Sequence, residues 1–202
     1  MLSPMASTDI WVSRTELAAL PMSGPAWSAL LAQANLPAGT PNLSDQTQMT
    51  NVYTLAKALV YARTGIEAYR TEVRQLCMSA IDTELDGVTL ALARELAAYV
   101  IAAGLVGMEP GEDVTFRAWL GRTLSETLTD GRTLRVTQET RPNNWGTMAG
   151  ASRAAVAVYL DDAAEVARTA QVFKGFLGDL TAFNAFIYGS DLSWHPNPAV
   201  PT

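Results

Sequence analysis

The sequence predicts an all-α fold made of stacked antiparallel helical hairpins. Apolar residues recur at helical spacing over most of the 202 residues, and alternating, strand-like patterns are nearly absent. The helical segments also come in pairs joined by short connections, which makes the two helices of a pair antiparallel neighbours. A chain of this length can bury a sizeable core, and we expect residues 1–202 to form a single domain.

Residues 1–41 are expected to hold short helices and a loop. Ser13 is followed three residues later by Glu16, which is the spacing of a capping box and predicts a helix start. A second short helix is expected in "PAWSALLAQAN", where apolar residues share one face. The segment "LPAGTPNLSD" is expected to be a loop that supplies Ser44 or Asp45 as the next N-cap.

Residues 42–187 are expected to form three helical hairpins. The predicted pairs of helices are 45–64 with 66–84, 88–106 with 112–129, and 146–160 with 162–178. One segment, residues 131–140, alternates in polarity and predicts either a short strand or an extended loop.

The hairpins also resemble one another in sequence. Residues 58–70 ("ALVYARTGIEAYR") align with residues 156–168 ("VAVYLDDAAEVAR"), with identical residues at four positions that include Tyr61 and Tyr159. Internal repetition is typical of stacked helix hairpins. Three such hairpins could form a solenoid or an arc of an α/α toroid.

The charge of the chain argues against nucleic acid as a partner, because the net charge is −6. The charge is unevenly distributed, however. Between Arg117 and Arg153 six arginines face three acids, so this span carries +3 while the remainder carries −9. A local basic patch on an acidic protein favours binding of an anion there.

No membrane partner, metal or cofactor is expected. The longest apolar run, residues 96–108, contains two glycines and is shorter than the ~20 residues of a membrane-spanning helix. The chain has a single histidine and a single cysteine, which argues against a metal site made of these two residue types. Cys77 lies in an apolar helical pattern and is expected to be buried.

The stretch "RPNNWGTMAGAS", residues 141–152, is the strongest candidate for a functional motif. Adjacent asparagines before an apolar helical pattern suit a helix N-cap. Side-chain amides beside an indole also suit a sugar, because an indole buries C–H surfaces well. One asparagine can serve both purposes, so the two interpretations stay open.

This stretch, with "NNWGTMAGASRAAVAVYLDD" as its core, resembles the alginate lyase family of polysaccharide lyases. Three other stretches fit the same family: "LAKALVYARTGIEAYR", "LALARELAAYVIAAGLVG" and "FRAWLGRTL". The resemblance covers about residues 42–195 and implies an incomplete α/α toroid. It also implies β-elimination in a uronic-acid polysaccharide such as alginate, and a periplasmic or extracellular location. Because family members continue with more helices, we expect this chain to be a copy that is incomplete at its C-terminus.

The resemblance implies a set of site residues. Many members have a histidine after the paired asparagines, where this chain has Trp145. The only histidine lies near the end of the chain, and Tyr188 is the only tyrosine outside the helical apolar patterns. The expected catalytic residues are Asn143, Asn144, Arg141, Arg153, Tyr188 and His195, and the expected substrate-binding residues are Trp145, Arg94, Arg135 and Trp194.

Two other functions stay open at this point. A glycoside hydrolase on a toroid needs two carboxylates flanking a cleft, and Asp130 and Glu139 are the only acids near the motif that could serve. A helical-repeat module that binds a sugar or a protein without catalysis is the other alternative, and the missing histidine favours it.

Overall fold

The computed structural model describes residues 10–187, and this part of the chain is built from helices without any strand. The all-α prediction is therefore confirmed. The helices are α1 (Arg14–Ala19), α2 (Pro25–Ala34), α3 (Thr50–Thr64), α4 (Glu67–Ala80), α5 (Thr89–Val106), α6 (Pro110–Thr123), α7 (Leu134–Thr140), α8 (Asn144–Tyr159) and α9 (Ala163–Phe176).

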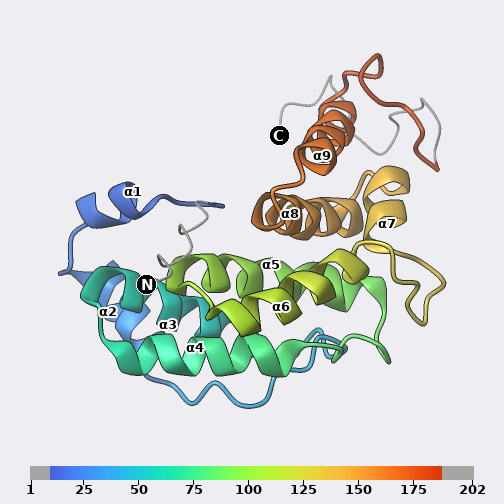
Figure 1. The fold of residues 1–202 in the computed structure, drawn as a ribbon. Coiled ribbons are helices and arrows are strands. Elements are labelled where there is room, and N and C mark those ends of the chain that lie inside the picture. The colour runs from blue at the N-terminus through green and yellow to red at the C-terminus, as the bar shows by residue number, and fades with distance from the viewer. Residues whose placement is uncertain (1–9, 188–202) are drawn as a thin grey trace.

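Helix α5 is the centre of the fold. It packs against α3 on one side and α8 on the other, and α4 also lies against it (Figure 1). Helices α1 and α9 lie at opposite ends of this layer and rise from the same side of it in Figure 1. Within each of the pairs α3–α4 and α8–α9 the two helices pack against each other as a hairpin, whereas α6 packs mainly against α4 and α8. The three-hairpin arrangement and its closure into a toroid stay predictions.

Helices α5 and α8 approach closely and run in the same direction. The Ser152 hydroxyl on α8 donates to the carbonyl of Ala93 at 2.8 Å and accepts from the amide of Ala97 at 3.1 Å. Further along, the Tyr159 hydroxyl reaches Asp113 in the first turn of α6, at 2.7 Å. Because α6 starts just after α5 ends, these contacts place the C-terminal ends of α5 and α8 together.

Helix α5 is also the one helix among residues 10–187 whose length and apolar composition would suffice to cross a membrane. In this fold 72% of that stretch is buried by neighbouring helices. A buried helix in the middle of a core has the same composition as a membrane span, so its sequence alone does not separate the two.

The two repeated segments occupy equivalent places. Residues 58–70 lead from α3 into α4, and residues 156–168 lead from α8 into α9. The first junction closes at Gly65, whose φ of 68° is left-handed as expected of a glycine that ends a helix. The capping box of Ser13 and Glu16 is confirmed at the start of α1, and Cys77 is fully buried, which raises the pKa of its thiol.

Several sequence predictions of helix bounds or type were wrong. Helix α6 ends at Thr123 rather than 129, and α4 ends at Ala80 rather than 84. Helix α3 begins at Thr50 rather than 45, and its N-cap is Met49 rather than Ser44 or Asp45. The Asp45 carboxylate instead accepts from the amide and the hydroxyl of Thr47 and holds a separate turn. Residues 134–140 form a helix, α7, and the expected strand or extended loop is absent there. The Thr133 hydroxyl accepts from the amide of Val136 and caps this helix, which outweighs the alternating polarity.

Candidate active site

The motif of residues 141–152 lies at the start of α8, as the sequence predicts. Asn143 is the N-cap, and its side-chain oxygen accepts from the amide of Trp145 at 3.0 Å. Asn144 is the first helical residue, and both asparagines are exposed. Within residues 10–187 neither side-chain NH₂ group donates a hydrogen bond. Both amides can therefore donate to a ligand at a helix N-terminus, where the backbone favours an anion.

Arg141 stacks on Trp145. The guanidinium carbon lies 4.5 Å from the centroid of the indole ring, within the range of a cation–π contact. Trp145 therefore holds an arginine beside the two asparagines. Gly146 makes this arrangement possible, since a Cβ at this position would stand 1.8 Å from the carbonyl oxygen of Arg141.

Arg153 has a different environment, because it is buried with 1% of its surface exposed. Its Nε donates to Glu165 on α9 at 2.7 Å, and its Nη1 donates to Gln138 and Glu139 on α7 at 2.9 and 3.0 Å. Arg153 therefore joins α7, α8 and α9, and its guanidinium does not face solvent.

Two further arginines complete this network. The Nε of Arg135 donates to Glu165 at 2.8 Å, and Arg168 donates to both oxygens of Glu139 at 2.9 and 3.1 Å. The hydrogen bonds from Arg168 and Arg153 lower the pKa of Glu139, and burial opposes them. Burial raises the pKa of Glu165, but the hydrogen bonds from Arg135 and Arg153 outweigh burial and the pKa is lowered. Both carboxylates are thus charged at neutral pH.

Ion pairs neutralise most of the basic patch that the sequence indicates. Four of its six arginines form ion pairs with acids. Two of those acids lie on α9 or in the turn before it, and another lies just after α4. The other two arginines, Arg132 and Arg141, have no ion pair among the described residues, and only Arg141 lies in the motif.

Arg94 on α5 is exposed and forms no ion pair within the described part of the chain. It lies in the turn of α5 that contacts Ser152, which is eight residues, or about 12 Å, along α8 from Asn144.

The neighbouring residue, Glu95, is buried with 2% of its surface exposed. Neither of its carboxylate oxygens has a hydrogen-bond partner in the described structure. Burial, with a smaller contribution from the charge of Asp45, raises the pKa of this carboxyl to about 7.

Tyr188, Trp194 and His195 lie outside the described residues. The sequence reasoning missed the roles of Gln138 and Glu165. The only signal in the sequence was that residues 117–153 hold more arginines than acids. Arginines that are buried there need acidic partners from elsewhere in the chain. Between residues 10 and 187 no group of three histidine, cysteine or acidic side chains is arranged to hold a metal ion.

Comparison with the sequence models of known families identifies a family for most of the chain. The sequence model of a family described as alginate lyase matches residues 44–181, which include α3 to α9 and the whole motif. No curated protein and no solved structure matches the chain.

Proposed function

The chain belongs to the alginate lyase family, and we propose that it cleaves a uronic-acid polysaccharide by β-elimination at the start of α8. The observation that carries the proposal is the cluster of Asn143, Asn144 and Arg141 at this helix N-terminus, where within residues 10–187 neither side-chain NH₂ group donates a hydrogen bond and the arginine has no ion pair. We include a periplasmic or extracellular location in the proposal.

The chemistry requires a stabilised carboxylate. In the elimination a base removes the C5 proton of a 4-linked uronic acid, and negative charge then moves onto the carboxylate beside C5. The C4–O4 bond next breaks as the C4–C5 double bond forms, and the leaving oxygen takes a proton from the acid. Amide donors and an arginine that are already in place stabilise this charge as it develops. In this proposal Asn143 and Asn144 donate through their side-chain NH₂ groups, and Arg141 supplies the positive charge.

Trp145 is proposed to hold Arg141 and to limit where a sugar can stack. Arg141 covers one face of the indole at 4.5 Å, so only the opposite face could meet a sugar ring. A tryptophan at this position cannot exchange a proton as a histidine does. The proton transfers therefore need another side chain, and Tyr188 and His195 stay the proposed acid and base.

Arg153 and Arg135 are proposed to act through structure rather than on the substrate. Both are engaged by Glu165, and Arg153 is shielded from solvent. Their role is to hold α7 and α9 against α8, which fixes the position of Arg141 between α7 and α8. Arg94 stays a proposed contact for a neighbouring uronate.

A glycoside hydrolase is less well supported. The Asp130 carboxylate accepts from the amide and the hydroxyl of Thr89 at 3.2 and 2.8 Å and so fixes the start of α5. Glu139 is paired with two arginines that lower its pKa, which is the opposite of what a proton-donating acid needs. Glu139 therefore does not suit the proton-donating acid that both inverting and retaining hydrolysis require, and Asp130 is engaged by Thr89.

The experiment measures unsaturated uronate, by the ultraviolet absorbance of its C4–C5 double bond, from polymannuronate, polyguluronate and other polyuronates. Asn144→Ala is expected to lower kcat about 100-fold, since one donor to a developing oxyanion is typically worth that much. Trp145→Phe should retain more activity than Trp145→Ala, because only an aromatic ring can stack on Arg141. If oligouronate binds the wild-type protein and no polymer is cleaved, the chain is a binding module and the lyase proposal fails.

A further inference from the structure

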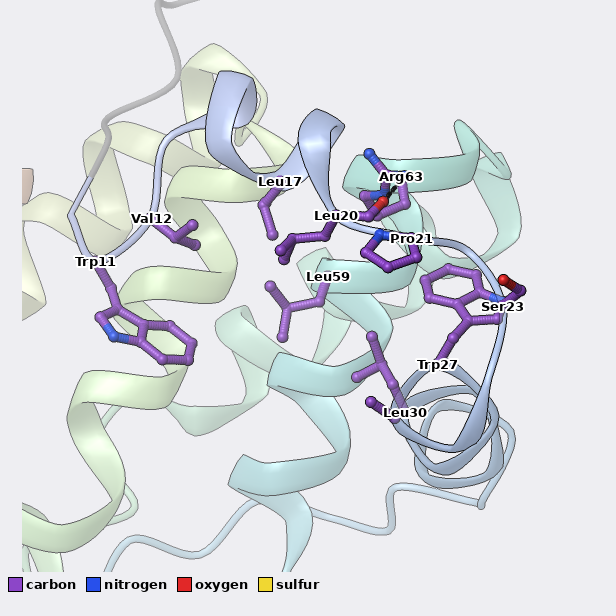
Figure 2. A pocket seen from close by; sticks show the side chains of 11 residues that line it. Trp11, Val12, Leu17, Leu20, Pro21, Ser23, Trp27, Leu30, Leu59 and Arg63 are labelled. Atoms are coloured by element: carbon purple, nitrogen blue, oxygen red, sulfur yellow. Dashed lines mark hydrogen bonds between the residues drawn. The ribbon is translucent and has the colours of Figure 1, made fainter.

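A pocket at the opposite end of the layer from the motif is lined by α1, α2, α3 and the segment that leads into α1. Its volume is about 460 Å³, which lies within the range of small-molecule sites. Figure 2 shows Trp11 at one end and Trp27 at the other, with Leu17, Leu20, Leu30 and Leu59 between them. The pocket is separate from the asparagine motif, and no residue of the proposed lyase site lines it.

The walls of this pocket are almost entirely apolar. Besides Arg63, the polar side-chain groups that its lining offers are the Ser23 hydroxyl and the N–H groups of two indoles. A sugar would leave most of its hydroxyl groups unpaired here, and each unpaired polar group opposes binding. The lining therefore disfavours a saccharide and favours an apolar ligand.

One charged side chain, that of Arg63, lies in the pocket wall. Arg63 reaches over from the last turn of α3, and its Nη2 donates to the carbonyl of Leu20 at 2.6 Å (Figure 2). Among the described residues no carboxylate lies within ion-pair distance of Arg63. The bond to Leu20 holds the guanidinium in place, and within residues 10–187 its charge has no ion-pair partner next to this apolar cavity.

The mouth of the pocket is also apolar. The residues Trp11 and Leu20 are 66% and 55% exposed, although both line the cavity. Exposed large apolar side chains around a concave site usually mark a place where a ligand covers them. A ligand with a hydrocarbon body would bury these side chains, and an anionic end would neutralise Arg63.

We propose that this pocket binds a free alkyl carboxylate, with its hydrocarbon chain between Trp11 and Trp27 and its carboxylate on Arg63. This activity is separate from the lyase reaction. A charge-assisted hydrogen bond from a guanidinium to a carboxylate selects the acid over an uncharged alcohol of the same length. The apolar walls select a longer chain over a shorter one.

The test is isothermal titration calorimetry of the whole chain with hexanoate, octanoate and decanoate below their micelle concentrations. Affinity should rise about tenfold for each two added methylene groups. Arg63→Gln should weaken decanoate binding at least tenfold and leave decanol binding unchanged. The matched control is Arg122→Gln, which removes the same charge from an exposed pair with Asp82 and should change nothing.

A second variant tests the cavity itself. Ala26 is exposed and lines the pocket, so Ala26→Phe should fill the cavity without disturbing the core, and circular dichroism checks the fold. Decanoate binding should then be lost. The proposal is overturned if decanoate binds no better than hexanoate, if Arg63→Gln or Ala26→Phe has no effect, or if oligouronate displaces decanoate. It is also overturned if the protein binds lipid vesicles through Trp11 and shows no saturable binding of free decanoate.

Discussion

Replacing Arg153 with methionine separates a structural role from a catalytic one, because the buried side chain joins three helices. Methionine retains most of the length of the arginine side chain and removes its charge. The change leaves Glu139 and Glu165 without a shared partner, although Arg168 and Arg135 still pair with them.

The magnitude follows from burial. Breaking a buried ion pair by removing one partner typically costs 3–5 kcal/mol, and the two remaining, half-exposed arginines offset part of this cost. We therefore expect the free energy of unfolding to fall by about 3 kcal/mol. For a chain of this size that corresponds to a decrease in Tm of about 6–12 °C.

The assay is thermal unfolding followed by circular dichroism, with Arg122→Met as the control. Arg122 and Asp82 form an exposed pair, at 54% and 50% side-chain exposure, so this variant should lose less than about 1 kcal/mol. The structural account of Arg153 is refuted if Arg153→Met melts like the control while its lyase activity falls 100-fold.

Three further changes test other parts of the structure. Glu95→Gln should stabilise the protein at pH 8 by on the order of 2–3 kcal/mol, measured by urea unfolding. The Glu95 carboxyl has a folded pKa of about 7 against an ordinary 4.5, so the wild-type protein loses stability as the pH rises between these two values. The same difference in stability between variant and wild type at pH 5 and at pH 8 would contradict this. Gly150→Ala should lower the free energy of unfolding by about 1–3 kcal/mol, since the new Cβ would lie 2.9 Å from the buried Gln138 amide. In Gly121→Ala the new Cβ meets no other atom, so this control should be neutral or stabilising. Similar melting curves for the two variants would refute the close packing at Gly150. Because the pKa of Glu139 is lowered in the folded state, its contribution to the free energy of unfolding is present above the unfolded pKa and is lost as the pH falls through the lower folded value. The stability of Glu139→Gln, measured as Tm against pH, should therefore be less sensitive to acid below about pH 4.5 than that of wild type.

The hairpins were predictable because their signals are local. Helical spacing of apolar residues and a glycine at position 65 identified α3 and α4 without any knowledge of their neighbours. Short alternating segments were not predictable in the same way. Residues 134–140 have a strand-like pattern, and their helix depends on the Thr133 cap and on packing against α8.

The site was only partly predictable. The N-cap position of Asn143 follows from its place before an apolar helix, so the exposure of both amides could be expected. The difference between Arg141 and Arg153 could not, since it depends on Glu165, which is distant from the motif in sequence and joins it only through the packing of α9 on α8.

The measurement that tests the account most directly is the release of unsaturated uronate by wild type, Arg141→Gln and Arg122→Gln on the same polyuronates. The two variants lose the same charge, and only Arg141 lies at the asparagine motif. The account predicts product from wild type and Arg122→Gln, and about 100-fold less from Arg141→Gln at equal folded concentration. Equal rates for the two variants, or no product from wild type on any polyuronate, would contradict it.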